Sequence, residues 1–153
     1  MSLRDLYAKY HNQVQFLLIY IREAHPIGGW WLGGDIAQQR LKAAGLKAVT
    51  DVYDPKTIEE RRAVAGRCET ALQYGIRTYV DEMDDAVSQT YAAMPTRLYL
   101  VGLDGRVVYA GGLGPFGFEP TELGTAIDEY IAQVGGAPAY LPAGPFPSSA
   151  ASL

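Results

Sequence analysis

A run of apolar side chains near the N-terminus constrains the fold of this chain more than any other feature. A run of this length is too short to cross a membrane as a helix. It predicts a strand over residues 14–22 that is buried on both faces, as in the middle of an α/β sheet. The apolar members are Val14, Phe16, Leu17, Leu18, Ile19, Tyr20 and Ile21.

Polar and aromatic residues follow this strand directly. Glu23, His25 and Trp30 come just past its C-terminal end, and the carboxyl ends of strands in open α/β sheets are where ligands collect. If the strand continues that far, residues 23 and 25 point to the same side. An acid and an imidazole so placed form a candidate proton relay. The alternative is that His25 only caps a loop at the strand end.

Composition excludes several classes of function. A length of 153 residues fits one domain with a core, and a net charge of -4 without a basic cluster argues against nucleic acid. The longest apolar run is too short for a membrane-spanning helix, so we expect a soluble, cytoplasmic protein that does not bind a membrane. One cysteine and two histidines leave no internal disulfide and no ordinary zinc site, so no metal or cofactor is expected.

Local patterns predict the remaining elements. Thr57 with Glu60 forms a capping-box pattern that starts one helix, Gly75 stops it, and Asp104-Gly105 between two apolar runs predicts a hairpin. Helices are predicted over residues 3–12 (with no N-cap ahead of it), 35–44 (with Asp35 as its cap), 58–74, 84–93 and 121–134. Strands are predicted over residues 76–80, 97–101 and 106–110, with an ambiguous one at 46–53.

Helical spacing assigns inward and outward faces. Residues 59–62 are charged and read as a solvated face of the helix over 58–74. Cys68 lies on the inward stripe of that helix, where a small core residue is one interpretation and a nucleophile or redox sensor the other. The inward residues are predicted to be Ile36, Leu41 and Ala44 in the second helix, Val64, Ala65, Cys68, Ala71 and Leu72 in the third, and Leu123, Ile127, Tyr130 and Ile131 in the last.

The order of the elements outlines a thioredoxin-like α/β fold, with a central mixed sheet and flanking helices. A strand, a crossover, a second parallel strand, a proline-led hairpin and a closing helix follow one another over residues 1–134. The bond from Met94 to Pro95 is predicted to be cis, as the proline at this place often is in that fold. Residues 135–153 are rich in Pro, Gly and Ala and predict an extended tail.

Two stretches carry a resemblance to a known family. The first is Tyr20-Ile21-Arg22-Glu23-Ala24-His25-Pro26 with Gly29-Trp30, and the second runs from Val80-Asp81-Glu82-Met83 to Tyr91-Ala92-Ala93-Met94-Pro95-Thr96-Arg97-Leu98-Tyr99. They resemble the Y-I-x-E-A-H-x-x-D-G-W and V-D-x-M…Y-x-A-x-P-x-R-L-Y patterns of the iodothyronine deiodinases, over about residues 3–134. The chain is similar to the bacterial members of that family.

The resemblance implies a reductive dehalogenase mechanism. In that family a selenocysteine or cysteine attacks the halogen of an iodinated phenol, and an external thiol is the expected reductant. The proton-relay roles would fall on Tyr20, Glu23 and His25, and substrate contacts on Arg97 and Trp30. The match begins inside the family's first helix, so the first strand of the fold and the nucleophile are expected to be missing ahead of Met1.

Two functions therefore stay open. The first is an oxidoreductase that dehalogenates an iodinated aromatic, or reduces a peroxide through a thiol or selenol, and that is inactive without its nucleophile. The second is a non-enzymatic binding module, in which an unpaired sheet edge supports a homodimer. A weaker third function would act through Cys68 alone.

Overall fold

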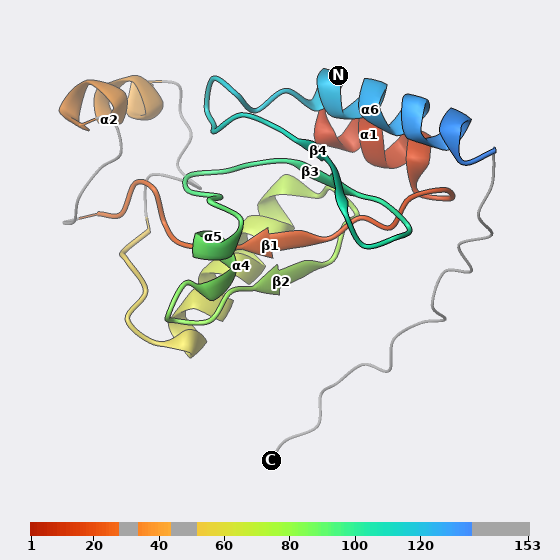
Figure 1. Cartoon of the computed structure of the whole chain (residues 1–153). Coiled ribbons are helices and arrows are strands. Elements are labelled where there is room, and N and C mark those ends of the chain that lie inside the picture. The colour runs from red at the N-terminus through yellow and green to blue at the C-terminus, as the bar shows by residue number, and fades with distance from the viewer. Residues whose placement is uncertain (28–33, 44–51, 136–153) are drawn as a thin grey trace, which may run out of the picture.

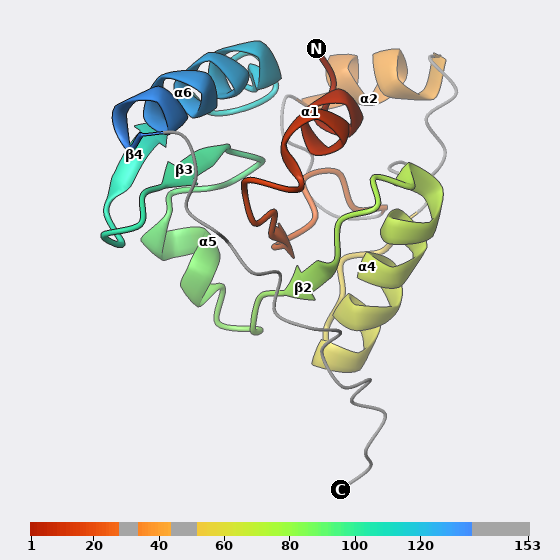
Figure 2. The ribbon, with the colours of Figure 1, turned by 90° about the vertical axis from the view of Figure 1, so that its right-hand side faces the viewer.

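The computed structural model describes residues 1–27, 34–43 and 52–135, and its strands form two small sheets (Figure 1). In both ribbon views the strands lie between the α1–α6 pair on one side and α4 on the other (Figures 1 and 2). This is an α/β arrangement. The elements are α1 (Leu3–Tyr10), β1 (Leu18–Tyr20), α2 (Gly34–Ala43), α4 (Ile58–Leu72), β2 (Thr78–Val80), α5 (Ala86–Thr90), β3 (Tyr99–Val101), β4 (Val107–Ala110) and α6 (Pro120–Gln133).

The two sheets differ in strand direction. β1 pairs with β2 in parallel, with Ile19 opposite Tyr79. β3 pairs with β4 in antiparallel register, as the predicted hairpin requires, and Gly105 takes a φ of +79° in its turn. The single central sheet that we predicted is not formed by the described strands, which make two two-stranded sheets. In Figures 1 and 2, β1 lies between β2 and the β3–β4 hairpin.

The core lies where α1 and α6 pack on the hairpin. α6 begins at Pro120, one residue ahead of the predicted start, because proline already has a helical φ and needs no hydrogen-bond acceptor in the first turn. Tyr10 is 1% exposed, and its hydroxyl donates to the carbonyl of Gly124 at 3.1 Å. The buried members of this core are Leu6, Tyr10, Leu100, Leu123 and Ile127.

Helix ends follow local signals, with two differences from the prediction. α1 has an N-cap after all, because Ser2 and Asp5 form a complete capping box. Thr57 caps α4 as predicted, accepting the amide of Glu60 at 3.2 Å, but the Glu60 carboxylate accepts from Lys56, one residue ahead of the cap.

Two further helix ends differ from the prediction. α4 ends at Leu72, before Gly75, because Gln73 itself adopts the left-handed conformation with a φ of 48°. Asp35 is the second residue of α2 and therefore not its cap.

Several burial predictions are wrong. β1 is short and packs on one face only, so Ile19 is 40% exposed, and Leu17, which precedes the strand, is 62% exposed. Ile36 in α2 and Leu72 at the end of α4 are 67% and 42% exposed, because the structure brings no covering element to those faces among the described residues. Ala71 is also exposed, whereas Val64 and Ala65 are buried as predicted.

Some predictions lie outside the described residues. Residues 44–51, with most of the ambiguous strand, and residues 136–153, with most of the predicted tail, belong to this group, as do Ala44 and the side chain of Leu41. Tyr53 does form an isolated parallel bridge with Ile27. Within the described ranges, none of the helices combines the length and the apolar character that a membrane span requires.

Candidate proton-relay site

The candidate site is centred on the end of β1. Tyr20 is the last residue of that strand, and its carbonyl accepts the amide of Asp81 at 2.9 Å. Its side chain is half-buried, and its hydroxyl donates a hydrogen bond to Oε1 of Glu23, which is also half-buried. The structure therefore joins two of the three predicted relay residues directly.

Burial shapes the acid–base behaviour of this pair. Burial raises the pKa of Glu23 above the ordinary value of 4.5, as does the nearby charge of Asp54, while the Tyr20 hydrogen bond and Arg67 act in the opposite direction. Burial, and then the hydrogen bond to Glu23, also raise the pKa of Tyr20. Tyr20 thus stays a hydrogen-bond donor at neutral pH, and Glu23 holds a proton more readily than an exposed glutamate.

His25 is placed by the chain that follows the strand. The strand ends at Tyr20, so the expected alternation that would put residues 23 and 25 on one side does not apply. His25 is half-buried and precedes Pro26, which is fully buried. The amide of Ile27 then donates to the carbonyl of Val52 at 2.7 Å, which anchors the segment just after the histidine.

Helix α4 supplies the neighbours of the pair. Cys68 is half-buried, and burial together with the charge of Glu23 raises its pKa, while Arg67 lowers it. A cysteine whose pKa is raised remains a thiol at neutral pH, and a thiol is a poor nucleophile. This environment does not favour the interpretation of Cys68 as an activated nucleophile.

The other predicted residues lie at the start of the hairpin. The Met94–Pro95 peptide bond is cis, the isomer that we predicted, and the Gly114–Pro115 bond is cis as well. Nε of Arg97 donates to the carbonyl of Gly111 at 2.6 Å, and its guanidinium lies 5.1 Å from the ring centroid of Tyr99. Arg97 is half-buried and is therefore more than an edge charge in solvent.

Trp30 lies outside the described residues. Within the described ranges, no group of three or more His, Cys, Asp or Glu side chains could hold a metal ion.

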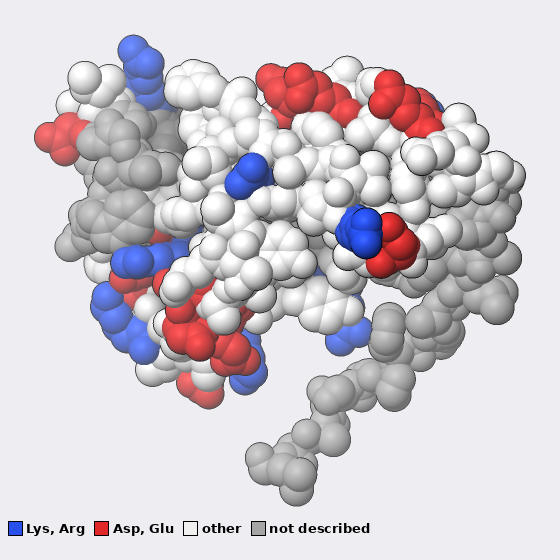
Figure 3. Space-filling model, viewed as in Figure 1, with Lys and Arg blue, Asp and Glu red and all other residues white. Residues whose placement is uncertain are grey.

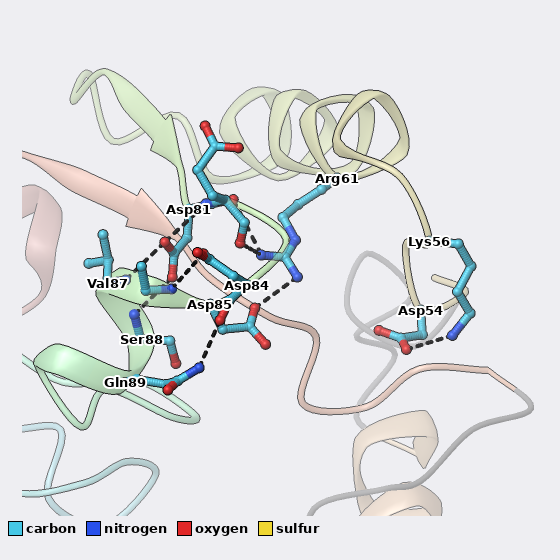
Figure 4. A network of polar contacts seen from close by, with 11 residues as sticks. Asp54, Lys56, Arg61, Asp81, Asp84, Asp85, Val87, Ser88 and Gln89 are labelled. Carbon is cyan, nitrogen blue, oxygen red and sulfur yellow. Dashed lines mark hydrogen bonds and ion pairs between the residues drawn. The ribbon is translucent and has the colours of Figure 1, made fainter.

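Two charged residues beside the site were missed by sequence reasoning. Arg61 was assigned to a solvated face, which is wrong, since it is 4% exposed and its guanidinium reaches the β2–α5 junction (Figure 4). Asp81, which the sequence marks only as part of a motif, is 2% exposed. Arg61 lies three and four residues ahead of Val64 and Ala65, so extending that apolar stripe back by one turn could have found it.

Comparisons with known proteins identify the family. A family model described as "Iodothyronine deiodinase" matches residues 1–131. "Thyroxine 5-deiodinase" of sheep (Ovis aries) is 34% identical over 140 residues, covering 88% of this chain and 41% of the relative. The human protein of that name (Homo sapiens) is 34% identical over 141 residues, covering 89% of this chain and 40% of the relative. The chicken protein (Gallus gallus) is 36% identical over 138 residues, covering 84% of this chain and 44% of the relative.

The chain spans less than half the length of these curated relatives. The residues that match the family model nevertheless include all of β1 and β2, the segment around Pro95 and the β3–β4 hairpin. By the extent of the family match and by these identities, the chain belongs to the iodothyronine deiodinase family.

Proposed function

We propose that this chain carries the proton-donating and substrate-holding part of a reductive dehalogenase that acts on an iodinated phenol. The observation that carries the proposal is the hydrogen bond from Tyr20 to Glu23 at a half-buried strand end, where burial raises the pKa of the carboxyl group. A carboxyl group whose pKa is raised keeps its proton to a higher pH than an exposed glutamate, and it can donate that proton to a reacting group.

The chemistry requires one proton and a chalcogen nucleophile. A selenolate or thiolate forms a bond to iodine, the carbon–iodine bond breaks, and the carbon keeps the electron pair and takes a proton. Glu23 and His25 supply that proton, with Tyr20 holding the carboxyl group. Two electrons from an external thiol then reduce the selenium–iodine or sulfur–iodine bond and release iodide. We propose, as the family resemblance implies, that the nucleophile belongs to a part of the protein outside this chain, which covers 41% of the sheep relative.

Arg97 is proposed to hold a carboxylate of the substrate. Its Nε is already bound to the carbonyl of Gly111 and its guanidinium lies against Tyr99, so the planar group is fixed before a ligand arrives. The two terminal nitrogens form a fork that suits a carboxylate. Trp30 is proposed to stack on the aromatic ring of the substrate.

The fold is proposed to be thioredoxin-like with its first strand absent. Two features support this: helices on both sides of the strands, and two sheets that are not joined by hydrogen bonds among the described residues. An additional strand between β1 and β3 would make one mixed sheet of them.

The test is thiol-dependent release of iodide. An intact protein, extended at its N-terminus from its own gene, is incubated with an iodinated phenol and a dithiol, and both iodide and the dehalogenated phenol are measured. His25→Ala is expected to lower the rate about a hundredfold or more. The matched control is His11→Ala, since His11 is exposed and the hydrogen bond of its ring goes to the carbonyl of Tyr7, within its own helical turn.

Three results are distinguishable. Equal release of both products that depends on His25 supports the proposal. A parallel assay replaces the iodinated phenol by hydrogen peroxide, and consumption of peroxide without iodide release in the first assay supports the thiol or selenol peroxide reductase instead. No turnover of either substrate contradicts an enzymatic function.

A second candidate is a non-enzymatic module that dimerises through β1. The exposed apolar side chains of Leu17 and Ile19 favour it, because a strand with one described neighbour and an apolar face invites pairing. Sedimentation of the chain over a range of concentrations tests it, with Ile19→Lys expected to abolish a dimer. A wild-type chain that remains monomeric throughout contradicts it.

A further inference from the structure

Asp81 is a buried carboxylate whose polar groups are all engaged. Its Oδ1 accepts the amides of Glu82 and Val87, both at 3.0 Å, and its Oδ2 accepts the amide of Ser88 at 2.8 Å. Its own amide donates to the carbonyl of Tyr20, the residue whose hydroxyl holds Glu23. A single residue therefore binds the candidate site through its backbone and the start of α5 through its side chain.

Arg61 fixes this junction from the opposite side. Figure 4 shows its side chain reaching from α4 toward the loop between β2 and α5. Its Nη1 donates to the carbonyls of Asp81 at 3.3 Å and Glu82 at 2.6 Å, and its Nη2 lies 2.9 Å from Oδ1 of Asp85. The positive charge of Arg61 thus lies beside the partly buried carboxylate of Asp85, which lowers the cost of burying that carboxylate.

A continuous series of contacts leads from α5 to Arg97. The carbonyls of Val87 and Ser88 accept the amides of Tyr91 and Ala93, at 3.0 and 2.9 Å. The hydroxyl of Tyr99 donates to the carbonyl of Tyr91 at 2.5 Å, and the two rings meet edge to face with centroids 5.2 Å apart. The guanidinium of Arg97 lies on the ring of Tyr99.

We propose that Asp81 is a positioning residue that holds residues 91–97 in alignment with the Tyr20–Glu23 pair, while Arg61 holds the same junction through the carbonyls of Asp81 and Glu82. Asp81 touches neither Glu23 nor Arg97 in the contacts described above, and it acts through the backbone of Tyr20 on one side and through α5 on the other. The inference rests on the proposed function only in treating Arg97 as the substrate-holding residue.

Asp81→Asn tests the proposal, because asparagine keeps the shape but turns an NH₂ group toward one of the three amides. We expect the NMR signals of the Arg97 Nε–H group and the Tyr20 ring to shift, and exchange of the Arg97 Nε–H hydrogen to become about tenfold faster. The matched control is Asp84→Asn, since Asp84 is exposed and its carboxylate binds the amide of Ala86 in the same loop. Binding of 3,5-diiodotyrosine, an iodinated phenol with a carboxylate, is expected to weaken about tenfold in Asp81→Asn alone.

Loss of thermal stability with unchanged Arg97 and Tyr20 signals would overturn the proposal, because it is what a purely structural role produces. Failure of the wild-type chain to bind diiodotyrosine would count against the proposed function, while the NMR signals would still decide the role of Asp81. If Asp81→Asn does not fold, Arg61→Lys replaces it, since lysine keeps the charge but cannot reach all three acceptors. The Ser88 amide and Arg97 signals should then shift together, and an unmoved Arg97 signal refutes the link.

Discussion

Arg61→Met should destabilise the chain far more than its place on a charged stretch of sequence suggests. The arginine is 4% exposed and binds the carbonyls of Asp81 and Glu82 as well as the Asp85 carboxylate, whose side chain is 21% exposed. Methionine fills a similar volume but leaves these three acceptors unpaired. Breaking a buried charge pair by removing one partner costs about 3–5 kcal/mol.

The geometry places the expected loss at the lower end of that range. Nε of Arg61 has no hydrogen-bond acceptor among the described residues, and Asp85 Oδ1 lies close to Nη2 without a directed hydrogen bond. The native interaction is therefore incompletely satisfied, and we expect a loss of about 3 kcal/mol. This is a large part of the roughly 5–15 kcal/mol that stabilises an ordinary domain.

Urea unfolding at 25 °C, followed by far-ultraviolet circular dichroism, measures the loss. Arg106→Met is the control, because Arg106 is 88% exposed and its ion pair with Asp104 is 3.9 Å long, so its loss should stay within about 1 kcal/mol. The double variant Arg61→Met/Asp85→Asn should recover part of the stability, since it no longer leaves the Asp85 charge unpaired. Equal midpoints for Arg61→Met and Arg106→Met would refute the reasoning.

Three further predictions concern the site and the backbone. Because burial raises the pKa of Glu23 in the folded state, its neutral form stabilises the fold below the unfolded pKa, and this stabilisation is lost as the pH rises through the folded pKa. Glu23→Gln should lack that loss. If the free energy of unfolding of the two proteins changes with pH in parallel, the prediction is contradicted. Cys68 should react with a disulfide reagent more slowly than free cysteine at neutral pH, because its pKa is raised. Glu23→Gln should speed the reaction, whereas Glu59→Gln, at an exposed position, should not. A native reaction as fast as that of free cysteine would disprove the raised pKa. Gly117→Ala should lower the free energy of unfolding by about 1–3 kcal/mol, because a Cβ there would lie 2.5 Å from the carbonyl carbon of Gly112. Gly66→Ala in α4, where a Cβ would have nothing within 4 Å, should raise it by about 0.5–1 kcal/mol. Thermal melts that fail to separate the two variants would contradict the close approach of Gly117 to Gly112.

The parts of the fold that sequence predicts well are those set by neighbouring residues. Thr57 caps a helix through an amide three residues away, and Asp104-Gly105 lies in the short turn that joins β3 to β4. The cis bond before Pro95 and the start of α6 at Pro120 depend on the covalent geometry of proline. Such signals need no knowledge of the rest of the chain.

The parts that fail depend on partners distant in sequence. The run around Ile19 reads as a doubly buried strand, yet its burial depends on which strands and helices cover it. Arg61 reads as a surface charge because its acceptors lie twenty or more residues away, across the β2–α5 junction.

The candidate site shows the same difference between contacts within a short segment and contacts between distant segments. The Tyr20–Glu23 contact spans three residues and lies within one signature, although the regular strand that was expected to carry it ends at Tyr20. Asp81 and Arg67 reach the site from other elements, so no pattern within the signature points to them.

The division of the strands into two sheets has a consequence for how the protein opens. β2, which pairs with β1, packs with α4, and β3 and β4 pack with α6, so each pair of strands has a helix of its own. Figure 3 shows the face of the molecule seen in Figure 1, where acidic side chains gather over α6 and around α5 and the surface between them is largely uncharged. Hydrogen exchange should therefore resolve two cooperative units that unfold at different free energies, with the segment after Asp81 as the boundary between them.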